Sequence, residues 1–283
     1  MAEVLKEFMT DCAEDGVVIA GDEPREAVAG MESSGVEGCD SNSTEGGFDV
    51  IITGCHDFQH ATARDGIQSL DRPHSMSLGR SFEGKVLKTF SSAQSMHMFI
   101  LTTEGLFSMG KNFSGQCGLG DLLNRTEPSP VSLPFDDVND IVKIVTGKFH
   151  SLLLHRCGNL YAAGQNACGQ LGLGDKSMCR DFPTFTLVSS AAVVGQVVDV
   201  AAGELHSLCC TTDGTLYSWG HPDSGVLGNG TDGRFIEKAG KISFHYVVVP
   251  EPVRNFVTKD HKHRNTEEHK DIKVRSVSAG KTH

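Results

Sequence analysis

A repeated unit rich in glycine constrains this chain more than any other feature of its 283 residues. The stretch FHSLLLHRCGNLYAAGQNACGQLGLGD at residues 149–175 returns in looser form at residues 96–121 and 205–233. Self-similarity at a fixed period of this size is typical of solenoids, propellers and other repeat folds. The chain is therefore expected to be assembled from copies of one supersecondary unit. The histidines that align between the copies are His97, His150 and His206.

Each unit predicts a β-hairpin. An apolar run such as HSLLLH is followed by a tight turn and a second apolar run such as NLYAAG. Glycine supplies the positive φ that two-residue hairpin turns need. A glycine-rich loop and a further β-rich run complete about four short strands in roughly 55 residues, which favours a propeller blade and an all-β fold. The turn pairs are Glu104-Gly105, Cys157-Gly158 and Asp213-Gly214.

The glycine loops, of the form G-x-x-G-x-G, also invite comparison with phosphate-binding loops. A phosphate loop is expected once, between a strand and a helix, whereas these loops recur in every unit and no helical pattern follows them. We interpret them as backbone bends. The stretch GRSFEGKV at residues 79–86 nearly fits another phosphate-binding pattern, but Val86 replaces the required hydroxyl residue. A surface turn that leads into a blade strand is the favoured interpretation.

Charge is distributed unevenly along the chain. Residues 1–48 hold twelve acidic and two basic residues, which leaves about −1 of the net −11 for the rest. We expect residues 1–46 to form an acidic disordered tail and residues 47–283 to fold. A nearly neutral folded part has no nucleic-acid footprint.

Cellular location is indicated by three features of the sequence. The N-terminus lacks the pattern of a secretory signal, and no apolar run reaches the length of a membrane span. Nine cysteines without a CxxC pair are typical of reduced thiols in the nucleus or cytoplasm. The chain is therefore expected not to be secreted or inserted in a membrane.

Candidate reactive groups are sparse. His56 and His60 have helical spacing but no third ligand at a usual distance in sequence, and the three histidines of residues 260–270 fall in a charged stretch typical of a solvated loop. The repeated histidines recur with the fold and are expected to hydrogen-bond a loop backbone. No basic partner of Cys157 or Cys168 is predicted by spacing. We expect no catalytic residue, metal, cofactor or small-molecule substrate.

The units resemble the repeats of the regulator of chromosome condensation family. The shared signature reads G-x-x-H-S…D-G-x-L-Y-x-W-G…G-x-L-G-x-G, and the resemblance covers about residues 48–283. It implies a seven-bladed β-propeller. The tract YSWGHPDSGVLGNGTDGRFIEKAGKISFHYVVVPEPVRNFV resembles one branch of that family. This branch implies a mitotic regulator of the nucleus, cytoplasm and cytoskeleton that binds Rho- or Ral-class small GTPases, microtubules and centromeric chromatin.

The sequence departs from the complete family pattern. The first unit has Gln94 where the second has Gly147. Seven blades need about 385 residues, and about 235 are present, so we expect a C-terminally truncated homologue with three to four blades. The expected units span 86–140, 141–196 and 197–273, with a fourth begun at 274. The run FDVIITG at residues 48–54 is expected to lack its partner strand, which would leave unpaired edges at both ends.

The resemblance also implies a partner-binding surface, formed by the two residues between glycine and histidine in each repeat. A charge followed by a less polar residue suits protein recognition, although ordinary solvated loop residues remain the alternative. Two residues of the third-unit loop extend the candidate set. The candidate residues are Lys148, Phe149, Glu204, Leu205, Lys281, Asp223 and Arg234.

Two functions stay open on this basis. The first is a non-enzymatic scaffold that binds a small GTPase, and the alternative is a guanine-nucleotide exchange factor. The family's exchange activity implies a wedge-like insertion, and no segment is matched to one. A nucleotide-release assay separates the two.

Overall fold

The computed structural model describes residues 17–19, 49–54, 70–77, 85–92, 94–174, 180–188, 191–238, 240–254, 256–259, 266–269 and 272–283. Most of the predicted acidic tail, the two histidines of residues 56–60 and most of the GRSFEGKV stretch lie outside these residues. Val86 is described and begins a strand, as the sequence predicts.

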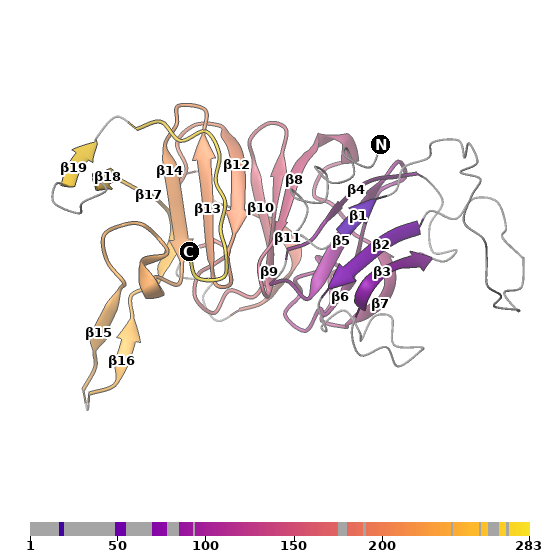
Figure 1. Cartoon of the computed structure of the whole chain (residues 1–283), viewed down its shortest axis with the longest axis horizontal. Helices are drawn as coiled ribbons and strands as arrows, with labels where there is room; N and C mark the ends of the chain where they lie inside the picture. The colour runs from indigo at the N-terminus through magenta and orange to yellow at the C-terminus, as the bar shows by residue number, and fades with distance from the viewer. Residues whose placement is uncertain are drawn as a thin grey trace, which may run out of the picture.

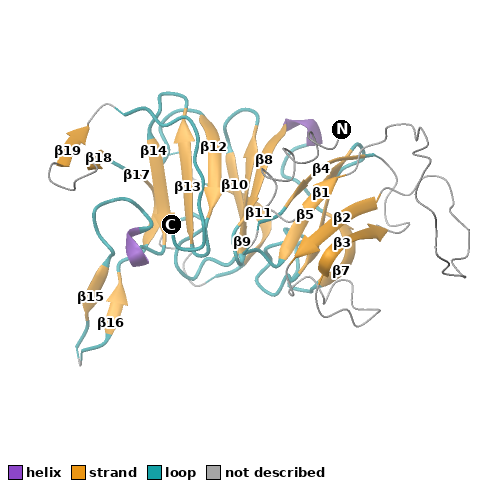
Figure 2. Cartoon of the chain, in the orientation of Figure 1, coloured by secondary structure: helices purple, strands orange, loops and turns teal. Residues whose placement is uncertain are grey.

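Three four-stranded antiparallel sheets form the body of the molecule, and neighbouring strands in each are consecutive in the chain except in the third (Figures 1 and 2). We call them the first, second and third blades. The first contains β4 (Val86–Phe90), β5 (His97–Thr102), β6 (Leu106–Gly110) and β7 (Arg125–Pro130). The second contains β8 (Ile141–Thr146), β9 (His150–His155), β10 (Leu160–Gly164) and β11 (Phe182–Leu187). The third contains β12 (Val197–Ala202), β13 (His206–Thr211), β14 (Leu216–Gly220) and β17 (Val247–Pro252).

The blades stand side by side in a row (Figure 1), and the partial β-propeller predicted from the sequence is confirmed. The exact unit boundaries stay a prediction. Two hairpins extend the third blade. They are β15 (Arg234–Ile236) with β16 (Ile242–Phe244), inserted between β14 and β17, and β18 (Phe256–Lys259) with β19 (Thr266–His269). Two short 3-10 turns, η2 (Val138–Asp140) and η4 (Asp223–Gly225), precede β8 and follow β14.

A smaller three-stranded sheet precedes the blades. β2 (Asp49–Gly54) pairs on one side with β1 (Val17–Ile19) and on the other with β3 (Leu70–Ser77). The expectation that this strand, without a partner from the far end of the chain, has unpaired edges is therefore wrong. The apolar residues Val17–Ile19, inside the segment predicted to be disordered, satisfy one edge of β2, and β3 satisfies the other.

The cores lie between adjacent blades. Phe99 and Leu101 of the first blade pack with Ile144 and Leu153 of the second. Leu152 and Leu154 of the second blade share another buried cluster with Trp219 of the third. Trp219 is fully buried, and its indole Nε1 donates a hydrogen bond to the backbone oxygen of Gln170 at 2.9 Å. The second sheet therefore has both faces engaged, because it lies between the first blade and the third.

A buried polar link joins each blade to the next. Nε2 of His97 in the first blade lies 2.6 Å from Oγ of Ser151 in the second. The Ser151 hydroxyl then donates to the backbone oxygen of Gln116, in the glycine loop of the first blade, at 2.8 Å. The link from the second blade to the third repeats this arrangement at 3.1 and 2.8 Å, through His150, Ser207 and the Gln170 oxygen.

The hydrogen-bond directions in this link follow from proton counting. Because each serine hydroxyl has one hydrogen and donates it to a carbonyl, the histidine Nε2 must be the donor to serine Oγ. The pKa of both His97 and His150 is lowered to about 3, chiefly by burial, so the rings are neutral at physiological pH. The expectation of a direct bond to a loop backbone is corrected for His97 and His150, since a serine stands between each of these rings and the loop.

The Gly-x-x-His turn places each ring. The backbone N–H of Gly147 donates to the backbone oxygen of His150 at 2.8 Å, and the imidazole covers the glycine. A Cβ at Gly147 would overlap the ring, and the same holds for Gly203 under His206 and for Gly280 under His283. Glycine is thus required here by close approach rather than by backbone dihedral.

Residues 272–283 lie against the third blade in an extended course (Figure 1). The Val274 N–H donates to the Gly214 oxygen and the Val277 N–H to Oδ2 of Asp199, both at 2.9 Å. Gly280 and His283 close another Gly-x-x-His turn, with a backbone hydrogen bond of 2.8 Å. This segment therefore repeats the local geometry found at the start of the second and third blades.

Substitution of Gly147 tests the turn. We expect Gly147→Ala to lower the free energy of unfolding by about 2–3 kcal/mol, because the new methyl group displaces the His150 ring. Gly105→Ala is the matched control, since the nearest atom to its Cβ would be 3.9 Å away; its effect should stay within about 0.5 kcal/mol. Urea denaturation measures both, and equal effects would contradict the account.

The buried histidines predict acid sensitivity. Their folded pKa of about 3 lies below the ordinary histidine pKa of 6.5, so between these values the unfolded chain binds more protons. The contribution of these histidines to the free energy of unfolding is intact above pH 6.5. It is lost as pH falls, at about 1.4 kcal/mol per pH unit for each histidine. His150→Gln should reduce this slope by about that amount between pH 5.5 and 4. Parallel stability curves for the two proteins would refute the prediction.

Candidate functional site

The Gly-x-x-His turns bring the candidate residues to one end of the blades. The turns join β8 to β9 and β12 to β13, and residues 280–283 form a third; all lie at the lower end in Figure 1. We call the surface formed by the two middle residues of these turns the turn face. It comprises Lys148, Phe149, Glu204, Leu205, Lys281 and Thr282.

Glu204 sits at the centre of a charge network on the turn face. Its Oε1 pairs with Nζ of Lys148, and its Oε2 lies 3.8 Å from Nζ of Lys281. The hydrogen bond from Lys148 is the main cause that lowers the pKa of Glu204, so the carboxylate is ionised at neutral pH. The Lys281 side chain is 70% exposed and that of Lys148 only 30%. Lys281 is therefore the charge in this network most available to a partner.

An aromatic pair lies next to this network. The rings of Phe149 and Phe113 have centroids 5.2 Å apart, and Nζ of Lys148 lies 5.2 Å from the Phe149 centroid. Phe113 is 46% exposed, although it is a large apolar residue. The sequence analysis missed Phe113. The sequence feature that could have identified it is an aromatic residue in the glycine loop of the first unit, at a position where the second unit has Ala167.

Asp223 and Arg234 form a second cluster near the same end. Nη2 of Arg234 lies 2.8 Å from Oδ1 of Asp223, and its Nε lies 3.5 Å from Oδ2 of Asp232. Both side chains of the first pair are about half exposed. The cluster follows β14, whose last residue Gly220 pairs with His206 at the start of β13. A hollow of about 710 Å³, lined by residues that include Ser224 and Asp232, adjoins it.

The hairpin β15–β16 projects from this end of the third blade (Figure 1). Ile236 and Ile242 are register partners on it and are 76% and 59% exposed. At its base the rings of His221 and Phe244 have centroids 4.6 Å apart. The sequence analysis treated this segment as an insertion without assigning a hairpin, although RFI and ISF flank a turn that contains Gly240, with φ of +77°.

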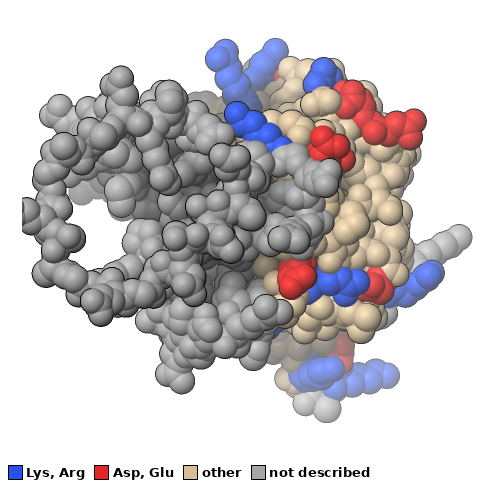
Figure 3. Space-filling view, turned by 90° about the vertical axis from the view of Figure 1, so that its right-hand side faces the viewer, with Lys and Arg blue, Asp and Glu red and all other residues tan. Residues whose placement is uncertain are grey.

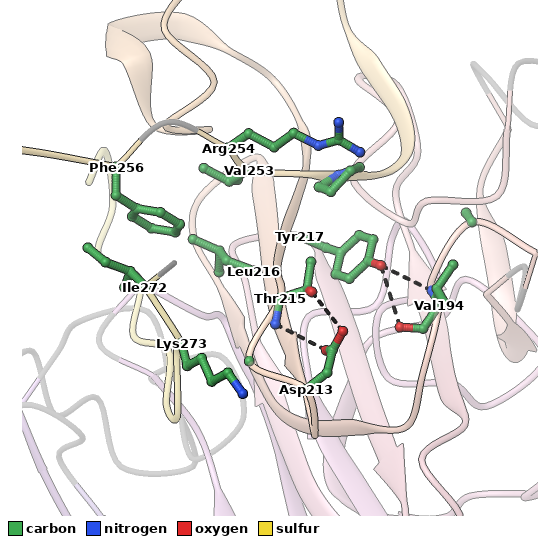
Figure 4. A pocket seen from close by; sticks show the side chains of 13 residues that line it. Val194, Asp213, Thr215, Leu216, Tyr217, Val253, Arg254, Phe256, Ile272 and Lys273 are labelled. Atoms are coloured by element: carbon green, nitrogen blue, oxygen red, sulfur yellow. Dashed lines mark hydrogen bonds between the residues drawn. The ribbon is translucent and has the colours of Figure 1, made fainter. Parts of the chain in front are cut away.

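A cavity of about 680 Å³ lies at the opposite end of the third blade (Figure 4). Its lining combines apolar residues such as Leu216 and Phe256 with the cations Arg254 and Lys273. Asp213 also lines it, but its carboxylate accepts from the N–H and hydroxyl of Thr215 at 3.2 and 3.0 Å. These bonds hold the β13–β14 turn, so Asp213 serves the fold.

Charged residues on the N-terminal side of the molecule are of both signs. Figure 3 shows blue and red residues near its upper and lower rims, with a largely uncharged wall between them. Among the described residues, no group of three histidine, cysteine or acidic side chains is placed to hold a metal. Within the same part of the chain, no helix is long and apolar enough to cross a membrane.

Protein-family profiles match the repeated units of this chain. Profiles of the regulator of chromosome condensation (RCC1) repeat match residues 104–154, 158–210, 141–170 and 197–226. The chain belongs to the RCC1 repeat family. The resemblance recognised from the repeat signature is thereby confirmed.

The curated relatives include RCC2 proteins. The RCC2 homolog of Danio rerio is 35% identical over 205 residues, covering 71% of this chain and 39% of its own length. Protein RCC2 of Homo sapiens is 32% identical over 226 residues, covering 80% of this chain and 42% of its own. The chain thus spans about two fifths of these relatives, and the branch of the RCC1 family indicated by the YSWGHPDSG tract is that of RCC2.

Solved structures support the same architecture. Prp20p of Saccharomyces cerevisiae aligns with a TM-score of 0.57 at 26% identity, covering 74% of this chain and 47% of its own. Human WBSCR16 aligns with a TM-score of 0.54 at 26% identity, covering 75% and 51%. Part of an RCC1-type propeller is therefore the structure of this chain.

A charge exchange tests the turn-face network. Lys148→Glu alone places two acids together and should cost about 1 kcal/mol of unfolding free energy. Adding Glu204→Lys should restore at least half of that loss, because the pair is re-formed with reversed signs. Chemical denaturation of the four proteins of this double-mutant cycle gives the coupling energy, and strict additivity would show that the pair does not contribute.

Proposed function

We propose that this chain is a non-enzymatic regulator that binds a small GTPase through the turn face. One observation carries the proposal. Three successive turns place a linked set of charges beside a pair of phenylalanines, of which Phe113 is about half exposed, at one end of a row of blades. Exposed aromatic residues beside charges on a preorganised backbone are characteristic of binding hot spots.

The family supports the nature of the partner. The RCC1 repeat resemblance implies a small GTPase, and the RCC2 branch implies the Rho or Ral class. Prp20p is described with its binding to Gsp1p and histones. The nearly neutral folded part favours a protein over a nucleic acid as the direct partner.

Each feature of the turn face has a role in this proposal. Lys281 steers encounter with an acidic patch of the GTPase, because it is the most exposed charge of the network. The ring of Phe113 supplies apolar area at the centre of the contact. Glu204 holds Lys148 in place, so less side-chain freedom is lost on binding.

Binding to purified GTPases tests the proposal. Lys281→Glu combined with Phe113→Ser should weaken binding to a Rho- or Ral-class GTPase at least tenfold, because it reverses the steering charge and removes the exposed ring. Arg156→Glu is the matched control, since Arg156 is 67% exposed at the β9–β10 turn at the opposite blade end. Calorimetry measures both variants. Equal effects of the two would contradict the turn face as the binding surface.

Guanine-nucleotide exchange is a second candidate, favoured by one observation. The hairpin β15–β16 projects from the blade end that carries the turn face and exposes Ile236 and Ile242. A projecting apolar hairpin is the kind of element that can displace a loop around a bound nucleotide. A fluorescent-GDP release assay decides between binding alone and exchange.

The hairpin gives that assay a specific variant. If the chain catalyses exchange, Ile236→Ser with Ile242→Ser should lower the release rate while affinity for the GTPase changes little. If it only binds, nucleotide release is the same with and without the chain. In that case the exchange alternative is discarded.

The finer cellular roles remain part of the proposal. The proposal includes association with microtubules and centromeric chromatin, in the nucleus, cytoplasm and cytoskeleton, and the resemblance to the RCC2 branch supports it. Co-sedimentation with microtubules and with nucleosomes tests each role separately from GTPase binding.

A further inference from the structure

At the tip of the second blade, a cysteine contacts a histidine, and the other side of that histidine faces an aspartate. Sγ of Cys157 lies 2.9 Å from Nδ1 of His155, and Nε2 of His155 lies 3.5 Å from Oδ2 of Asp140. Spacing predicted no basic partner of Cys157, and the structure supplies one in His155. The β9–β10 turn folds residue 155 back onto residue 157, a contact that no standard motif spacing describes.

The proton positions in this cluster follow from its hydrogen bonds. The backbone N–H of Cys157 donates to Nδ1 of His155 at 3.1 Å, so Nδ1 is an acceptor and Nε2 carries the ring proton, directed at Asp140. Nδ1 is therefore the atom able to take the thiol proton. This tautomer is the one that a base for Cys157 needs.

The histidine is held rather than mobile. The His155 ring packs edge-on against Phe135 with centroids 4.6 Å apart, and its side chain is only 14% exposed. Asp140 is fixed from the other side, with Oδ1 3.4 Å from Nε of Arg156. The exposed thiol of Cys157 therefore lies next to a base, His155, which is held in position and oriented by the Asp140 carboxylate.

The other described cysteines differ in exposure. Cys157 is exposed, whereas Cys117, Cys209 and Cys210 are buried and Cys168 is partly covered. Burial raises the pKa of Cys117 and of Cys209 to about 12. Because the thiolate is the nucleophile, these buried thiols are inert at neutral pH.

We propose that Cys157 is a thiol–disulfide exchange site, with His155 as its base and Asp140 as a positioning residue, which takes a low-molecular-weight disulfide. His155 Nδ1 accepts the thiol proton, and the thiolate attacks one sulfur of the disulfide. The disulfide bond breaks as the Cys157–sulfur bond forms. The leaving thiolate takes the proton from His155 and departs as a thiol, so one disulfide is exchanged for another without a further oxidant.

Reaction with oxidised glutathione tests the proposal. The native protein is treated between pH 6 and 9, and the mixed disulfide on Cys157 is followed over time by peptide mass spectrometry. An ordinary thiol is only about 3% ionised at pH 7, so we expect Cys157 to react about ten- to thirtyfold faster than the same cysteine in the denatured chain.

Variants separate base assistance from simple exposure. His155→Gln should slow the reaction about tenfold at pH 7 and alter its pH profile, because the base that accepts the thiol proton is lost. Asp140→Asn should slow the reaction about threefold. Because this variant keeps the packing of the His155 ring, it tests the proposal even if His155→Gln is unstable. His245→Gln, an exposed histidine of the β15–β16 region, is the matched control and should leave the rate unchanged. A rate and pH profile of Cys157 that neither His155→Gln nor Asp140→Asn alters would overturn the proposal.

Discussion

The buried link of histidine, serine and carbonyl between blades is the interaction on which the rest of the structure depends. Each link uses a histidine and a glycine-loop carbonyl from one blade and a serine from the next. The hydrogen bonds of this link cross from one blade to the next, so they form only when the blades are in register. Leaving such groups unpaired in a buried site is costly. The link therefore fixes the spacing and orientation of adjacent blades and also stabilises the fold.

The functional surface follows from the same constraint. Placing the His150 ring over Gly147 leaves the two intervening residues on the outside of the turn, and the next turn presents Glu204 within reach of Lys148. The charge network is therefore a consequence of blade register, and residues 56 positions apart in sequence become neighbours. The opposite blade end carries the cavity of Figure 4 and the Cys157 cluster, so the two ends differ in chemistry.

The features that recur in every unit could be predicted from the sequence. The hairpins, the glycine turns and the blade-like sheets follow from the recurrence of units such as HSLLLH and NLYAAG. What could not be predicted depends on contacts between units or across irregular segments. The serine after His150 is an ordinary strand residue until the preceding blade is placed beside it. Pairing of β2 with Val17–Ile19, the exposure of Phe113 and the approach of His155 to Cys157 likewise depend on tertiary geometry that single-sequence patterns do not encode.

The account centres on the claim that the turn face binds a small GTPase. Amide hydrogen exchange of the chain, with and without a bound Rho- or Ral-class GTPase, measures the footprint directly. The account predicts slower exchange at residues 147–150, 203–206 and 280–283, which form the turns of that face. Protection confined to the opposite turns at residues 156–159 and 212–215 would contradict it.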